Sequence, residues 1–390
     1  MRWWALLALA LPCAALAEDA DFVFSGPAPA RNFQPIQLIF LHLPFERAAT
    51  LRAGELAFHL ESAESNEIAT SDGRIDARLK FETNRTVLGA RYGVAPGWDV
   101  GIDLPFITRY GGFLDPFIDA VESAFESENG ERDIYDENEF GAFDVLKGQT
   151  VVFEGGKETF QPGDLWFSAK REFRLPDPWP LLAARGAIKA PSGEADDVLG
   201  SGKPDFGLGL AAEHRPLSRV MLYLNLDLVI PVGPVTDADL SLNPFFTQAF
   251  AAEFAVTRRW SLQYHQALYT SPFHGNGAKL LDGTVVELGF AINFAFREWL
   301  GVQLLAINNV SGVEQAADFT VLLALDSRGW FLPFTRKTPP ASLPPLSEGA
   351  LPPVIETPPE VDGAPAAPPP VVPEPTPMSR ELPPLGEQLQ

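Results

Sequence analysis

In the stretch TVVELGFAINFAF, residues 284–296, large apolar side chains alternate with small or polar ones. One face carries Val286, Leu288, Phe290, Ile292, Phe294 and Phe296, and the other carries Glu287, Gly289, Ala291, Asn293 and Ala295. A period of two residues is typical of a β-strand. An apolar face opposite a small or polar face, repeated along a chain, is typical of a β-barrel in a lipid bilayer.

Twelve segments of the chain show this alternation, and most have the roughly 9–11 residues that a tilted strand needs to cross the hydrocarbon layer. We expect strands at 54–62, 79–94, 98–107, 163–174, 180–190, 204–214, 219–231, 244–257, 259–270, 284–296, 299–309 and 317–326. The predicted fold is all-β, a twelve-stranded antiparallel transmembrane β-barrel. The alternation changes phase near Asn84, which predicts a β-bulge there.

The connections between these segments alternate in length. Short turns fall at 95–97, 176–178, 216–218, 258–259 and 297–298, and longer loops at 63–78, 108–162, 191–203, 232–243, 271–283 and 310–316. Outer-membrane barrels have short periplasmic turns and long external loops. With an even number of strands, both termini are expected in the periplasm, below the outer membrane of a Gram-negative bacterium.

Four tryptophans lie at or beside the short turns: Trp98, Trp179, Trp260 and Trp299. Tryptophan prefers the headgroup layer, because its ring is apolar while its N–H needs a polar partner. We therefore interpret these four side chains as membrane-interface anchors. A soluble β-sandwich would not gather its tryptophans at one end of the strands.

The two ends of the chain differ in composition from the strands. Residues 1–17 resemble a signal peptide, with Arg2, an apolar run and the small residues Ala15 and Ala17. The single cysteine, Cys13, would leave with it. Residues 18–53 form an N-terminal segment that is expected either to plug the barrel or to cap it from the periplasm. After the barrel at 54–326 we expect a short connector, 327–337, and a disordered periplasmic tail, 338–390, in which about one residue in three is proline.

The net charge of −22 argues against nucleic-acid binding, which needs a basic surface. Acidic residues are concentrated between Asp115 and Glu158, where they suit a solvated loop or divalent cations that bridge to anionic lipid. In the longest loop, 108–162, Phe113, Phe117, Val121 and Phe125 repeat every four residues, which is a helical spacing. The predicted amphipathic helix either packs as a lid on the barrel mouth, lies in the outer leaflet or gates a hydrophobic ligand.

The charged side of each strand must face the lumen, because a cation on the lipid side costs roughly 2–4 kcal/mol at mid-membrane depth. The candidate pore-lining residues are Glu55, His59, Glu61, Arg85, Arg91, Asp99, Asp103, Lys170, Glu172, Arg185, Lys189, Glu213, Asp227, Glu253, His265 and Glu287. They form either a structural ion-pair network or a charged constriction that selects a solute. Many inward positions, such as Gly207 and Ala211, are small and leave space inside.

No catalytic motif is recognisable. Ser261 and His265 share a strand face, but there is no nucleophile elbow, no metalloprotease motif and no calcium loop. We therefore expect no enzymatic activity, no metal site and no cofactor.

Several short motifs resemble a proteobacterial family called domain of unknown function 3187. They are GPAPARNFQP at 26–35, RYG at 91–93, GWDVG at 97–101, LPF at 104–106 and FLDPFI at 113–118. The resemblance covers about residues 24–330 and excludes the proline-rich tail. It implies an outer-membrane location, and it transfers no activity and no catalytic residue.

The leading functional hypothesis is therefore a passive channel or transporter for small molecules through a lumen of mixed charge, with outer-membrane lipid around it. The alternative is a structural or docking protein whose proline-rich tail reaches a periplasmic partner. A lipid-modifying enzyme is the third hypothesis.

Overall fold

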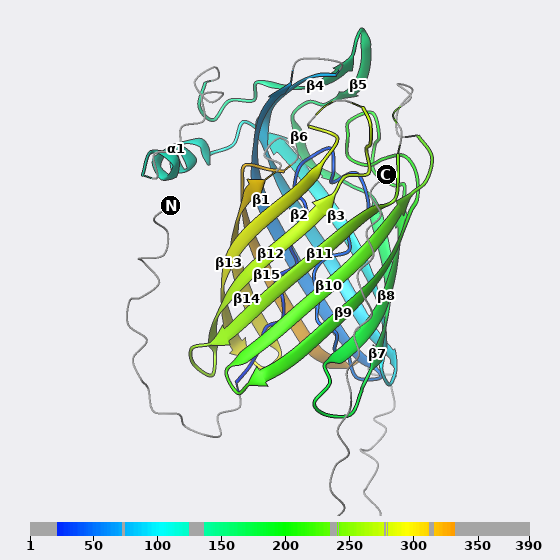
Figure 1. Ribbon diagram of the computed structural model, residues 1–390, viewed down its shortest axis with the longest axis vertical. Coiled ribbons are helices and arrows are strands. Elements are labelled where there is room, and N and C mark those ends of the chain that lie inside the picture. The colour runs from blue at the N-terminus through cyan, green and yellow to red at the C-terminus, as the bar shows by residue number, and fades with distance from the viewer. Residues whose placement is uncertain are drawn as a thin grey trace, which may run out of the picture. The chain divides into compact units, whose positions relative to one another are not determined.

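The computed structural model describes residues 22–71, 75–124, 136–234, 240, 242–276, 278, 280–311 and 316–331. Twelve strands, each antiparallel to its neighbours, form a closed barrel (Figure 1). They are β1 (Glu55–Ser71), β2 (Asp76–Ala95), β3 (Trp98–Tyr110), β7 (Leu165–Phe173), β8 (Leu181–Ala190), β9 (Asp205–Leu217), β10 (Val220–Pro231), β11 (Phe245–Ala255), β12 (Trp260–Thr270), β13 (Thr284–Arg297), β14 (Leu300–Ser311) and β15 (Phe319–Phe331). The predicted twelve-stranded barrel is confirmed. The expected signal peptide at 1–17 and the tail at 338–390 lie outside the described residues.

The barrel closes where the last strand meets the first. β15 pairs with β1 from Glu55 opposite Phe331 to Asn66 opposite Phe319. Because β1 also pairs with β2, no strand of the ring has a free edge. The five turns β2–β3, β7–β8, β9–β10, β11–β12 and β13–β14 lie at one end, here called the short-turn end. The other end is called the long-loop end.

The two faces of the wall differ as the alternation requires. Large apolar side chains on the outer face are exposed; Leu208 and Phe290, for example, each have a relative accessibility of 65%. In the middle of the wall, charged and small side chains face inward, and most of them are buried. Among the described residues, no helix is long and apolar enough to cross a membrane.

Exposed aromatic side chains mark the short-turn end. Trp98 opens β3, Trp260 opens β12, Trp299 precedes β14, and Trp179 lies in the turn between β7 and β8. The guanidinium of Arg171 lies over the Trp98 ring, 5.2 Å from its centroid. Arg171 is a cation on the outer face of the wall. It is stabilised there because it lies over an aromatic ring next to a turn, away from the middle of the wall.

Three details of the strand prediction are wrong. Residues 63–71 and 76–78 were expected in a loop, but they extend the hairpin of β1 and β2, and β15 runs to Phe331 instead of ending at 326. The expected bulge near Asn84 is absent, because the β1–β2 register is continuous from Leu56 to Ser71. Leu79 and Phe81 point inward like Arg85, but they pack in an apolar cluster at the long-loop end. The inward side chains change there from polar to apolar, while the same alternate positions of the strand continue to point inward.

The extended hairpin supports the long loop between β3 and β7. That loop contains a helix, α1 (Asp115–Ala124), and three short strands, β4 (Ala142–Lys147), β5 (Thr150–Glu154) and β6 (Glu158–Pro162). β4 pairs with β2, and β6 pairs with β3 (Figure 1). The loop thereby lengthens the wall beyond the apolar part of the barrel.

The helix α1 packs beside the barrel and does not cover its mouth as a lid. The Asp115 carboxylate accepts hydrogen bonds from Lys80 Nζ on β2 and from Asn66 Nδ2 on β1, at outward-facing positions. The Phe117 ring lies 5.5 Å from the ring of Phe319, the first residue of β15. Half of the Phe117 side chain stays exposed, next to the apolar outer face.

The attachment of α1 is expected to depend on pH. Burial raises the pKa of the Asp115 carboxyl, but hydrogen bonds from Lys80 and from the backbone N–H of Asn138 outweigh burial, so its folded pKa lies below the ordinary value. A lowered folded pKa stabilises the fold above the unfolded value, about 4, and this stabilisation is lost as pH falls through the folded pKa. Amide exchange in residues 114–120, corrected for intrinsic rates, should therefore be slow at pH 6 and fast near pH 3.

Two variants sharpen this test. Lys80→Ala should move the loss of protection to higher pH, because the main cation on Asp115 is gone. Asp144→Asn, which removes the partner of the exposed Arg78, should leave α1 unchanged. Equal protection of α1 at both pH values in the unmodified protein would contradict the role given to Asp115.

Candidate functional site

All the residues proposed to line the lumen lie on the inward face. Fourteen of the sixteen are buried, and His59 and Arg91 are partly exposed. They do not border empty space, because residues 22–53, here called the N-terminal segment, lie within the ring of strands (Figure 1). The contacts of this segment define the site.

The N-terminal segment forms an irregular hairpin that starts and ends near the short-turn end. Phe22 and Phe24 lie beneath Arg219 and Arg215, which flank the β9–β10 turn. The segment then rises to the long-loop end around residues 36–40 and returns. Its last residues meet the start of β1, where Gly54 N–H donates to the Gly93 carbonyl.

Side chains of the wall hold the rising arm through its backbone. The N–H groups of Ser25 and Gly26 donate to the Glu253 carboxylate at 3.0 and 3.2 Å. Gln263 accepts from Ala28 N–H at 3.0 Å and donates to the Gly26 carbonyl at 2.9 Å. Pro27 and Pro29 have no N–H, so the proline-rich sequence leaves few donors to satisfy here. Side chains of the polar inner face thus make the backbone hydrogen bonds that a neighbouring strand would otherwise make with this arm.

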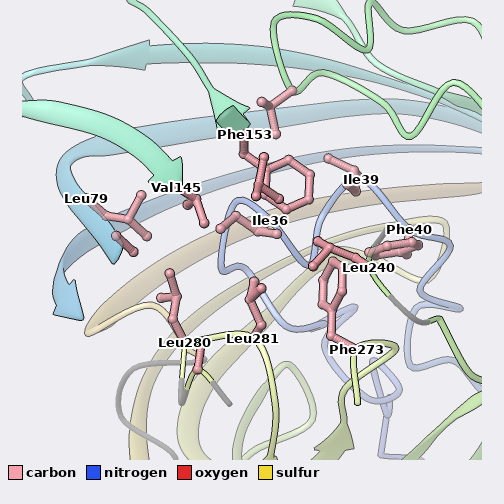
Figure 2. Packing of buried hydrophobic residues seen from close by; sticks show 14 of the residues in the cluster. Ile36, Ile39, Phe40, Leu79, Val145, Phe153, Leu240, Phe273, Leu280 and Leu281 are labelled. Atoms are coloured by element: carbon pink, nitrogen blue, oxygen red, sulfur yellow. The ribbon is translucent and has the colours of Figure 1, made fainter. Parts of the chain in front are cut away.

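An apolar cluster encloses the tip of the segment at the long-loop end. Ile36, Ile39 and Phe40 are buried against loop residues that include Phe153, Leu240, Phe273, Leu280 and Leu281 (Figure 2). The Phe40 and Phe273 rings meet edge to face, with centroids 5.4 Å apart. Each fully buried side chain of this size contributes about 1.5–3 kcal/mol. This end of the lumen is sealed by hydrophobic packing.

The returning arm is held by ion pairs, and Glu46 is their centre. Its carboxylate lies 2.8 Å from Lys170 Nζ, 3.3 Å from a terminal nitrogen of Arg91 and 3.2 Å from one of Arg185. Arg185 also pairs with Asp227, and its guanidinium donates to the Pro44 carbonyl at 2.7 Å. One glutamate of the segment therefore joins three cations from β2, β7 and β8.

Two arginines of the segment pair with carboxylates of the wall. Arg31 lies 2.5 Å from Glu61 on β1, and both side chains are nearly inaccessible. Arg47 binds Glu213 on β9 through two parallel hydrogen bonds of 3.0 and 3.1 Å. Bidentate contacts between a guanidinium and a carboxylate are among the strongest in proteins.

Small residues of the wall make room for the segment. A Cβ atom at Gly207 would lie 2.4 Å from Cδ1 of Leu43, and one at Gly93 would lie 2.1 Å from the Arg52 carbonyl oxygen. Ala48 packs against Ala183 and Ala211. The space that these small residues leave in the lumen is occupied by the protein's own chain.

Other candidate residues form separate contacts. His59 lies 2.6 Å from Asp103, next to Glu61. Lys189 lies 2.7 Å from Asp164 and 3.1 Å from Asp205. Glu55 pairs with Arg52, Glu172 accepts from Thr50, and Asp99 accepts from Leu51 N–H. Arg85 lies over the Trp166 ring, and no ion pair is found for Glu287 among the described residues.

The arrangement offers no support for a hydrolase. Ser261 donates its hydroxyl to Glu253 at 2.5 Å, while His265 stacks on Phe45 with centroids 4.9 Å apart. Within the described part of the chain, no group of three or more potential metal ligands occurs. A cavity of about 130 Å³ remains beside the N-terminal segment, and Glu46, His59, Arg91 and Lys170 are among the residues that line it.

Sequence reasoning missed the partners that the N-terminal segment supplies. Arg31, Glu46, Arg47 and Arg52 were not among the candidate residues, although they are the charged side chains of the proline-containing stretch 22–53. It also missed Trp330, whose ring lies 6.0 Å from that of Trp299. Trp330 lies in the part of β15 that was not expected to be a strand.

A family model described as "Protein of unknown function (DUF3187)" matches residues 4–328. The chain belongs to this family. The resemblance noted in the short motifs is therefore confirmed for this DUF3187 protein. None of the curated proteins matches the chain.

Several solved barrels resemble this DUF3187 protein. The COG4313 outer membrane channel from Pseudomonas putida F1 is 13% identical, with a TM-score of 0.49, over 72% of this chain and 97% of the other. The NanC porin is 8% identical, with a TM-score of 0.42, over 70% and 100%. The CymD monoaromatic hydrocarbon channel is 9% identical, with a TM-score of 0.34, over 80% and 99%. Similarity at this level transfers no function.

Substitution of Glu46 tests the ionic attachment of the segment. In Glu46→Gln, the charge that neutralises Lys170, Arg91 and Arg185 is lost, and breaking a buried ion pair costs roughly 3–5 kcal/mol. Because Lys170 and Arg185 keep wall carboxylates, we expect the free energy that holds the segment in place to fall by less, about 1.4 kcal/mol or more. Amide exchange in residues 45–51 should therefore be at least about tenfold faster. Glu298→Gln, in the β13–β14 turn, should leave these rates unchanged. Unchanged exchange in Glu46→Gln would contradict the attachment.

A matched pair of glycines tests the fit of the segment. Gly207→Val places methyl groups where Leu43 lies, whereas a Cβ at Gly186, on the outer face of the neighbouring strand, meets no atom closer than 3.7 Å. Gly207→Val should therefore increase protease cleavage within residues 36–50 several-fold, and Gly186→Val should not. Equal cleavage of the two variants would show that the segment does not depend on this contact.

Proposed function

We propose that this DUF3187 protein is an outer-membrane channel for small molecules and that its N-terminal segment closes it. The observation that carries the proposal is the kind of contact that holds the segment. Its rising and returning arms are held by ion pairs and by hydrogen bonds to wall side chains. A wall lined with charged groups is suited to water and polar solutes once these partners leave.

The outer face supports a location in the outer membrane. It carries exposed leucine, isoleucine, valine and phenylalanine side chains around the ring, and tryptophans near the short-turn end. Such a surface would be costly in water and is typical of barrels surrounded by lipid. The even number of strands and the short turns at one end support periplasmic termini.

The path of the segment supports its role as a removable plug. Both of its ends lie at the short-turn end, at the β9–β10 turn and at the start of β1. The hairpin can therefore withdraw toward that side without passing the apolar cluster of the external loops. Twelve strands enclose more space than the eight that side chains alone can fill.

The alternative function, docking through the tail, rests on residues outside the described part of the chain. It remains a hypothesis. Deletion of residues 338–390 distinguishes a docking function of the tail from the channel function of the barrel. If the tail serves only a periplasmic partner, its removal leaves conductance unchanged.

Conductance in a planar lipid bilayer tests the channel. The mature chain should show low conductance with brief openings, and deletion of residues 24–50 should give steady conductance several-fold higher. Gly207→Val, with the full chain present, should open more often than Gly186→Val. Each variant is first shown to be folded by its β-sheet circular dichroism and by its heat-dependent migration in gel electrophoresis.

Two results would overturn the proposal. One is a folded deletion variant that conducts no more than the full chain and takes up no small solutes in liposomes. The other is a full chain that already conducts as well as the deletion variant, because the segment would then not close the lumen.

A further inference from the structure

We infer that the lumen, once the N-terminal segment has left, selects small cations over anions. This inference rests on the proposed channel and adds its substrate class. It follows from the unequal distribution of charge between the wall and the segment.

Carboxylates outnumber cations on the inward face of the barrel. The inward carboxylates are Glu55, Glu61, Glu67, Asp99, Asp103, Asp164, Glu172, Asp205, Glu213, Asp227, Glu253 and Glu287, and the inward cations are Arg85, Arg91, Arg109, Lys170, Arg185 and Lys189. Asp326 and Arg328, which also line the remaining cavity, balance each other. The wall alone therefore carries an excess of negative charge.

The N-terminal segment supplies charge of the opposite sign. Between residues 22 and 53 it contains Arg31, Arg47 and Arg52 but only one acidic residue, Glu46. The three arginines pair with Glu61, Glu213 and Glu55. The N–H groups of the segment also solvate Glu253. In the closed state the segment thus acts as the counter-ion of the wall.

Withdrawal of the segment affects the cations and the carboxylates of the wall differently. Lys170, Arg185 and Lys189 lose Glu46 or a carbonyl of the segment, but they keep Asp99, Asp227, Asp164 and Asp205 as partners. Arg91 also loses Glu46 and is left with the nearby carboxylates of Asp99 and Asp103. Glu61 and Glu213 lose the arginines bound to them. Glu253 keeps Tyr223 and Ser261, which carry no positive charge. The unpaired charge of the open lumen is therefore mainly negative.

Two of the released carboxylates lie close together on the wall. Glu213 is opposite Tyr223 in the β9–β10 register, and the Tyr223 hydroxyl donates to Glu253 at 2.8 Å. Glu213 and Glu253 thus flank one side chain near the short-turn end. Carboxylates in a narrow, water-filled passage through a low-dielectric wall concentrate cations and repel anions.

The test is the permeability ratio of potassium to chloride, obtained from the reversal potential across a KCl gradient. It is measured on the full chain with Gly207→Val, which favours opening, and on the variant that lacks residues 24–50. Both should favour potassium several-fold. Adding Glu213→Gln and Glu253→Gln should bring the ratio toward one, whereas Asp144→Asn, on β4 outside the lumen, should leave it unchanged.

The outcomes separate this inference from the channel itself. Conductance with a ratio near one, or with a preference for chloride, would overturn cation selection while leaving the channel in place. A preference for potassium that survives both glutamate substitutions would overturn the assignment to Glu213 and Glu253. Absence of conductance in all folded variants would refute the proposed channel.

Discussion

An apolar outer wall forces the charged side chains in the middle of these strands inward, and the charges then need partners in a confined space. An unpaired ion that is removed from water costs several kcal/mol or more. In this protein the wall supplies part of the pairing, as in Arg185 with Asp227 and Lys189 with Asp164. The remainder comes from the N-terminal segment, so the closed lumen requires strands and segment together.

The strands could be predicted because lipid imposes a period of two on the sequence. All twelve were found, and errors occurred where that constraint ends. Beyond Ser62, β1 continues through residues 63–71, whose outward Asn66 is covered by Asp115 of the long loop. Protein and not lipid lies against the outer face of this part of the strand, so its outward residues need not be apolar. The alternation of apolar residues therefore does not reveal it. The same reason explains the false bulge at Asn84, where the inner face changes from polar to apolar contacts.

The occupied lumen could be predicted only in part. The inward phase of the charged residues was evident from the cost of exposing them to lipid, and the glycines indicated free space. The N-terminal segment itself has no period, because each of its backbone groups finds a different side chain of the wall, as Gly26 finds Glu253 and Leu41 finds Asp205. Pairings such as Glu46 with Lys170 depend on which strands are adjacent, and no local sequence signal contains that information.

The two kinds of contact along the N-terminal segment have different consequences for opening. Ion pairs such as Arg47 with Glu213 exchange for water at moderate cost once the short-turn end admits it, because the solvated ions are themselves stable. The tip, with Phe40 against Phe273, has no such alternative and loses packing when it leaves. Opening should thus begin at the short-turn end and finish at the apolar cluster. A charge change near Glu46 then alters how easily the segment loosens, whereas a change at the tip alters how completely the lumen opens.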